Sequence, residues 1–92
     1  MSKFYVIRLT KTDILIGKGF YYCNVETEKL MSLLPEENGK VLVYTKNNND
    51  LTETHYIKES FFHHISKEYK LNITGVIDET EIPKDCHPDL SL

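Results

Sequence analysis

Lys58 to Tyr69, which reads Lys-Glu-Ser-Phe-Phe-His-His-Ile-Ser-Lys-Glu-Tyr, decides the fold class. Large apolar residues recur there at a spacing of four, and one further phenylalanine widens the stripe: Ile57, Phe61, Ile65, Tyr69 and Phe62. This spacing places them along one side of a helix, while the charged residues fall mostly on the other side. Such a helix needs a sheet or another helix against its apolar stripe. The pattern therefore predicts a helix from about residue 58 to residue 70.

The N-terminal part of the chain has the alternation that is typical of strands. Residues 3–9 predict one strand, whose successive side chains face opposite sides. Thr10 to Asp13 is turn-like. Residues 13–23 contain Gly17 and Gly19 and indicate either one hairpin around the glycines or one broken strand.

The middle of the chain predicts a hairpin. Residues 40–46 and 51–57 both have strand patterns and are separated by a polar, Asn-rich connection. An alternative starts the long helix near Asp50, with Asp50 and Glu53 as a capping box. The hairpin is favoured because the second segment contains the strand-favouring residues Thr52, Thr54 and Tyr56.

Two more elements complete the predicted fold. Asn24 can cap a short helix, and Pro35 ends that helix because it disfavours helical backbone at Leu34. Residues 72–77 predict a last strand. The fold class is therefore α+β: a mostly antiparallel sheet of four to six strands with two helices on one face. Residues 1–78 should form the single domain, and residues 79–92 an acidic, loosely ordered C-terminal tail.

Composition places further bounds on the protein. The 92 residues include 40% hydrophobic residues, enough for the core of one small domain. The two cysteines, Cys23 and Cys86, do not make a disulfide framework. Lys3 and Arg8 interrupt the first apolar run, so no signal peptide is recognised. We expect a soluble, cytoplasmic protein with reduced thiols.

The sequence has no specific catalytic or metal-binding motif. His63 and His64 are adjacent and would lie about 100° apart on a helix, so they share a face poorly. The paired ligand spacing of a zinc site is absent. Cys86 and His87 are neighbours, but adjacent residues rarely align a nucleophile with its base. We expect no enzyme activity, no cofactor and no metal.

Acidic residues are the most suggestive feature, because many lie at predicted helix starts and in loops. The net charge is −3, yet the start of the chain is basic and its end is acidic. Carboxylates spaced along one side of a protein can occupy a groove that binds the phosphates of DNA. The candidate partner-binding residues are Glu26, Glu28, Glu36, Glu37, Glu53, Glu59, Asp78, Glu79, Glu81, Asp85 and Asp89.

The start Met-Ser-Lys-Phe-Tyr-Val-Ile and the late acidic run Asp78-Glu79-Thr80-Glu81 belong to a short chain rich in Asn, Lys, Ile and Tyr. In size and composition the whole chain resembles the anti-restriction nuclease proteins of T-even phages. The resemblance implies an early phage protein that acts in the host cytoplasm. It also implies a DNA mimic, often dimeric, that inhibits a host restriction nuclease.

We therefore expect a non-enzymatic inhibitor of a host restriction nuclease or another DNA-binding protein, with no direct binding to nucleic acid and none to membranes. Self-association through an edge strand or a helix face is also expected. The alternative is a small nucleic-acid-binding module, in which Tyr5, Tyr21, Tyr22 and Tyr44 stack on bases near Lys3, Arg8 and Lys18.

Overall fold

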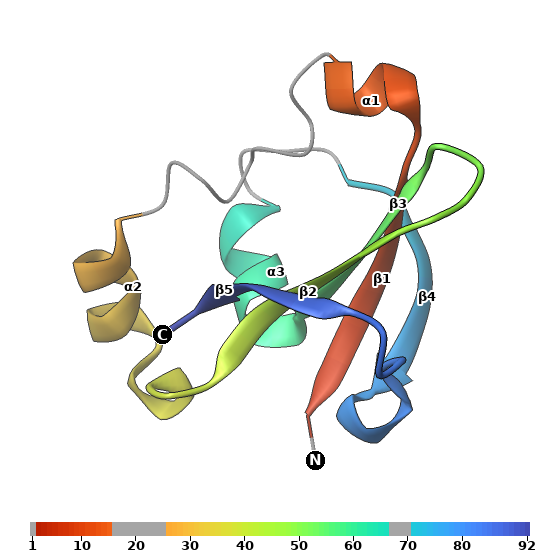
Figure 1. The fold of residues 1–92 in the computed structure, drawn as a ribbon. Coiled ribbons are helices and arrows are strands. Elements are labelled where there is room, and N and C mark those ends of the chain that lie inside the picture. The colour runs from red at the N-terminus through yellow and green to blue at the C-terminus, as the bar shows by residue number, and fades with distance from the viewer. Residues whose placement is uncertain (1, 16–25, 67–70) are drawn as a thin grey trace.

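The computed structural model describes residues 2–15, 26–66 and 71–92, which form a five-stranded antiparallel sheet with helices packed on it (Figure 1). The strands lie in the order β4-β1-β3-β2-β5. Their bounds are β1 Lys3–Leu9, β2 Val41–Asn47, β3 Glu53–Lys58, β4 Ile73–Asp78 and β5 His87–Ser91. The helices are α1 Lys11–Leu15, α2 Thr27–Leu33 and α3 Glu59–Ile65, and two 3-10 turns are η2 Pro35–Glu37 and η3 Glu79–Glu81.

One face of the sheet carries the main hydrophobic core. The central strands β1 and β3 pair with Tyr5 opposite Ile57 and Ile7 opposite His55. Helix α3 packs over these two strands and buries Phe61 and Ile65. Helix α2 adds Leu30 to the same core. The predicted apolar stripe of the helix is confirmed for Phe61, Phe62 and Ile65, whereas Ile57 lies in β3 and joins the core from the sheet. The placement of these two helices on one face is also confirmed.

The opposite face has a smaller aromatic cluster. Phe4 is fully buried, and its ring lies 5.9 Å from the ring of Tyr44. Tyr56, on the neighbouring strand, is also buried. The segment after η3 covers this face, where Lys46 forms an ion pair with Asp85 at 3.0 Å. Both faces of the sheet are thus covered near its centre.

The boundaries differ from the predictions at two helices. α3 ends at Ile65 with Ser66 as its C-cap, earlier than residue 70, and residues 67–70 lie outside the described part of the chain. The expected turn at Thr10 to Asp13 instead starts α1. Thr10 and Asp13 form reciprocal bonds, in which each backbone N–H donates to the other side chain at 2.9 and 3.2 Å, as in a capping box.

The remaining predicted elements are mixed in outcome. The strand 3–9, the hairpin of β2 and β3 and the strand at residues 72–77 are confirmed within one or two residues, although the strand at residues 72–77 is followed by another and is not the last. α2 begins at Thr27 and stops before Pro35, as the proline predicts. The proposed hairpin or broken strand over residues 13–23 and the cap at Asn24 fall mostly or wholly outside the described residues.

The expectation of a loosely ordered tail after residue 78 is wrong. Residues 87–91 form β5, which pairs with β2, and the backbone of Leu92 exchanges hydrogen bonds with Gly39 and Lys40 at 2.6 and 2.9 Å. Leu90 and Leu92 pack against the main core. Pro88 is compatible with this strand because β5 lies at the edge, where a missing donor is tolerated. The domain therefore continues to the end of the chain.

Phe61→Ala tests the central packing. Phe61 is fully buried between α3 and the sheet, so its truncation should lower the free energy of unfolding by about 3–5 kcal/mol. Leu33→Ala is the control, since Leu33 is 51% exposed on α2. Chemical denaturation measures both variants. Equal, small effects of the two substitutions would contradict the position of α3.

Candidate functional site

Five carboxylates gather at one end of the sheet, which we call the acidic end. β1 begins there, and β3 and β4 end there, because Lys3 pairs with Asp78 and Phe4 with both Ile77 and Lys58. In Figure 1 this is the end that carries the N-terminus, η3 and the start of α3. The five residues are Glu36, Glu59, Asp78, Glu79 and Glu81; Glu36 lies in η2, which the Glu37–Lys58 ion pair holds at this end, and Lys3 lies opposite Asp78.

The acidic turn is fixed to the start of β1. The backbone N–H of Glu79 donates to the Ser2 carbonyl at 2.9 Å. The Asp78 carboxylate accepts from the hydroxyl and backbone N–H of Thr80 at 2.7 and 3.1 Å. These bonds lower the pKa of Asp78, so it stays charged. Glu79 and Glu81 are exposed and lie on this short turn, which these hydrogen bonds fix in place.

A buried ion pair lies beneath this end. Lys58 Nζ is 2.5 Å from Glu37 Oε2, and the two side chains are only 6% and 11% exposed. Ser60 donates to the other carboxylate oxygen of Glu37 at 3.2 Å. A pocket of about 260 Å³ opens beside the pair and is lined by Ser2, Lys3, Glu37, Lys58, Glu59 and Ser60. The pair ties η2 to the junction of β3 and α3.

Glu59 is held at the rim of this pocket by a tyrosine. The Tyr5 hydroxyl donates to Glu59 Oε2 at 3.4 Å and lies 3.5 Å from His63 Nε2. The Tyr5 ring packs edge-on against Phe62 at 4.7 Å. Desolvation and then the charge of Glu59 raise the pKa of Tyr5, which keeps the hydroxyl protonated as a donor. Glu59 is therefore oriented but remains half-exposed.

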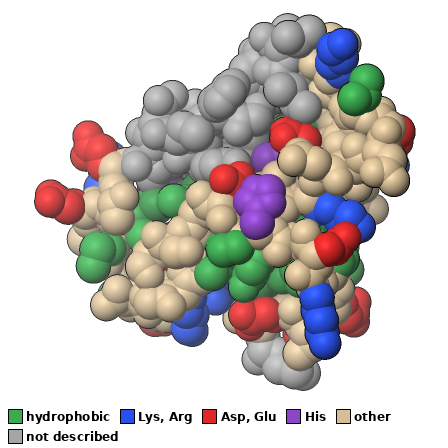
Figure 2. Space-filling model, viewed as in Figure 1, with side chains coloured by type: hydrophobic (Ala, Val, Ile, Leu, Met, Phe, Trp, Pro, Cys, Tyr) green, Lys and Arg blue, Asp and Glu red, His purple; other side chains and the backbone are tan. Residues whose placement is uncertain are grey.

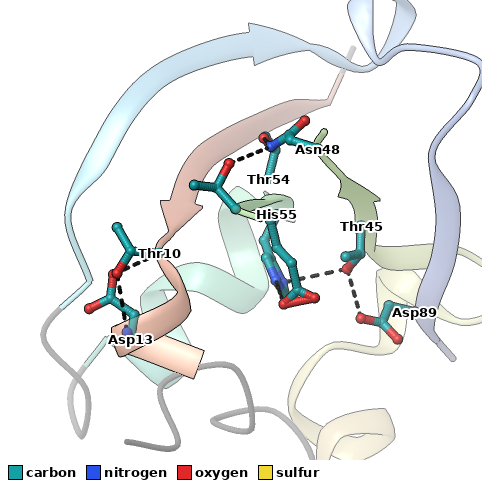
Figure 3. Close-up of polar contacts among 9 residues, drawn as sticks. Thr10, Asp13, Thr45, Asn48, Thr54, His55 and Asp89 are labelled. Atoms are coloured by element: carbon teal, nitrogen blue, oxygen red, sulfur yellow. Dashed lines mark hydrogen bonds and ion pairs between the residues drawn. The ribbon is translucent and has the colours of Figure 1, made fainter. Parts of the chain in front are cut away.

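A second polar cluster is buried on the helix-covered face. His55 is 2% exposed and lies opposite Thr45 in the β2–β3 ladder (Figure 3). Thr45 Oγ1 lies 3.4 Å from His55 Nδ1 and donates to Asp89 at 2.7 Å, while Glu53 Oε1 lies 3.5 Å from His55 Nε2. Burial lowers the pKa of His55, against the opposing effects of Glu53 and Asp89. This cluster links β5 to β2 and β3.

The other predicted carboxylates lie away from the acidic end or are neutralised. Glu26 and Glu28 are exposed at the start of α2. Asp85 pairs with Lys46, and Glu37 is buried against Lys58. On the face shown in Figure 2, Lys and Arg side chains lie between the acidic ones, so the carboxylates do not form one continuous surface there.

Several cations are also engaged. Arg8 forms an exposed ion pair with Asp50, in addition to the pairs made by Lys46 and Lys58. The sequence reasoning missed the buried pair, because Glu37 and Lys58 are far apart in the chain and neither occupies an apolar stripe. The burial of His55, in contrast, could be predicted from the sequence, because strand alternation places His55 on the same side as the apolar Ile57.

Two further features concern metal binding and thiol chemistry in the part of the chain that the structure describes. No group of three or more His, Cys, Asp and Glu residues there could hold a metal ion. Burial raises the pKa of the Cys86 thiol, which disfavours the reactive thiolate.

Within the described ranges, no helix has the length and apolar character needed to span a bilayer. No protein-family model, curated protein or solved structure matches the chain.

The buried pair predicts a strongly non-additive double mutant. Lys58→Met should lower the free energy of unfolding by about 3–5 kcal/mol, because it leaves a buried carboxylate without its cation. Adding Glu37→Leu should restore much of this loss, since the uncompensated charge is then removed. Urea denaturation of the two single variants and the double variant measures the coupling. Additive losses would contradict a buried, paired geometry.

His55 predicts a loss of stability on mild acidification. Its pKa is lowered from 6.5 in the folded state, so the unfolded chain binds the proton more tightly. The contribution of His55 to stability is complete about one pH unit above 6.5 and declines as the pH falls through that value. The lowered pKa values of Asp50, Asp78 and Asp85 also make stability fall with pH, but only near and below pH 3.8, the ordinary pKa of an aspartate.

The free energy of unfolding should therefore drop between about pH 7.5 and pH 5.5 in the unsubstituted protein. His55→Gln should flatten this dependence, whatever its effect on stability at neutral pH. Denaturation at several pH values gives the two slopes. An unchanged slope in the variant would show that His55 is not the responsible group.

Proposed function

We propose that the protein is a non-enzymatic inhibitor that occupies the DNA site of a host DNA-binding protein, with a restriction nuclease as the leading target. The contact surface is the acidic end, and the observation that carries the proposal is the gathering there of Glu36, Glu59, Asp78, Glu79 and Glu81. These carboxylates come from three separate segments of the chain, at residues 36, 59 and 78–81. None of them has a Lys or Arg partner in an ion pair between the described residues.

The arrangement fits the electrostatics of a DNA site. A DNA-binding groove is lined with Lys and Arg, which meet a phosphate charge about every 1.7 Å along the duplex axis. The acidic end offers several fixed carboxylates on a narrow molecule with extents of 37, 28 and 18 Å. Asp78 is held by Thr80, and Glu59 by Tyr5, so less side-chain freedom is lost when a partner binds.

The alternative of direct nucleic-acid binding has weaker support. Tyr5 packs edge-on against Phe62, and Tyr44 packs on Phe4, so both rings are already engaged in contacts within the fold. Arg8 and Lys46 are paired with carboxylates. Tyr21, Tyr22 and Lys18 lie outside the described residues. Stacking faces and free cations are the two requirements of that function.

Competition with DNA tests the proposal. Increasing amounts of the protein should release a labelled duplex from a restriction nuclease that cuts modified DNA, and the release should weaken as salt rises. Glu79→Gln with Glu81→Gln should weaken competition about tenfold, mainly through slower association. A gel-shift titration with a panel of such nucleases measures this.

Glu26→Gln with Glu28→Gln is the matched control. It removes the same charge from two residues at the same spacing, both exposed at the start of α2. Competition should be retained in this variant. Equal losses in the two double variants would assign the effect to net charge alone, and a complex between the protein and the duplex itself would favour the nucleic-acid-binding alternative.

A further inference from the structure

Strand β4 forms one edge of the sheet, and its outer side has no strand neighbour among the described residues (Figure 1). α3 packs over β1 and β3, which leaves the side chains of β4 on that face less covered. Val76 is 53% exposed and Ile73 is 45% exposed. An edge with unpaired backbone groups and exposed apolar side chains is a template for pairing with another strand.

The two edges of the sheet differ in their protection. β5 contains Pro88, which cannot donate to a ladder, and two irregularities interrupt its pairing with β2. β4 has a single irregularity, at the point opposite Val6 and Ile7. From Gly75 to Asp78 it is regular and has no proline and no lysine. Proline, lysine and strand irregularities, which commonly block edge pairing, are therefore absent from this half of β4.

The open part of β4 leads directly into the acidic end. Val76 pairs with Tyr5 and Asp78 with Lys3, so Val76 and Asp78 lie on the same face of the strand. Glu79 follows at once and is exposed. A strand added antiparallel to β4 would bring its earlier residues beside Asp78 and its later residues beside Val76. Opposite charges and apolar pairs stabilise such cross-strand neighbours.

We propose that β4 is a docking edge for an extended segment of a basic partner protein, which adds to the sheet as a sixth strand. The segment runs antiparallel to β4. It places a Lys or Arg beside Asp78 and Glu79, and two residues later a Val or Ile beside Val76. The basic character of the partner rests on the proposed function, whereas the strand pairing rests on the exposed edge itself.

A synthetic peptide tests the pairing without any nuclease. The probe is an acetylated, fluorescently labelled Ser-Arg-Thr-Val-Thr-Val-Ser peptide, and its binding is measured by anisotropy, with backbone amide shifts mapped by NMR. Shifts should centre on residues 75–79. Moving the arginine to the other end of the peptide should weaken binding about tenfold, because it is then far from Asp78. That preference should fade in high salt.

Val76→Lys is the diagnostic variant, since a lysine on an edge strand opposes pairing. It should weaken peptide binding about tenfold, while Leu33→Lys, at a similar exposure of 51% on α2, should leave binding unchanged. Thermal unfolding confirms that both variants are folded. No binding, equal effects of the two variants, or amide shifts confined to β5 would overturn the proposal.

The outcomes also separate docking from inhibition. If the unsubstituted protein does not bind the peptide but competes with DNA, and competition survives Val76→Lys, the proposed function stands and the docking edge is removed. Peptide binding without competition would support the docking edge and contradict the proposed function. Sedimentation could instead show that the unsubstituted protein is a dimer and the Val76→Lys variant a monomer. That result would mean that β4 pairs with a second copy of the chain, and it would contradict the proposed partner segment.

Discussion

The fold depends on the junction at which β3 passes directly into α3. Lys58 is the last residue of the strand and Glu59 the first residue of the helix, with no connecting loop. At this turn the Lys58 ammonium is held by Glu37 and lies 6.0 Å from the centre of the Phe4 ring. The turn places Phe61 and Ile65 over the central strands. A buried cation without a partner would be costly at this position, so η2 must close over the junction.

The same junction organises the acidic end. Once α3 starts at Glu59, its first carboxylate lies beside Tyr5 and close to the start of β1. β4 must end at the same place because it is antiparallel to β1, and η3 then follows with Asp78, Glu79 and Glu81. The charges gather through topology, since residues 36, 59 and 78–81 are widely separated in the sequence. The sheet edge and the acidic end are continuous for the same reason.

Local patterns predicted most of the fold. Periodicity found β1, the β2–β3 hairpin, α3 and β4, and Pro35 marked the end of α2. The C-terminal strand was missed because Pro83 and Pro88 and the acidic residues are local signals of a loop. Leu90 and Leu92 pack on the core through long-range contacts, which a local pattern does not contain.

The candidate site was predicted only in part for a related reason. Exposed acidic residues at element ends could be recognised, but an alignment of charges from separate segments requires the strand order β4-β1-β3-β2-β5. Glu37 illustrates the limit: in the sequence it resembles its exposed neighbour Glu36, yet it is buried by its pairing with Lys58. Pairing likewise neutralises Asp85. The charge that remains available to a partner is therefore set by tertiary contacts.

Hydrogen–deuterium exchange on a complex with a DNA-binding protein tests most directly whether the acidic end replaces DNA. The predicted result is slower exchange in η3, in the first turn of α3 and along β4, with α2 and β5 unchanged. The same experiment with a DNA duplex alone should change nothing. Slower exchange confined to α2 or β5, or any protection by the duplex alone, would contradict the assignment of the acidic end as the partner-binding surface.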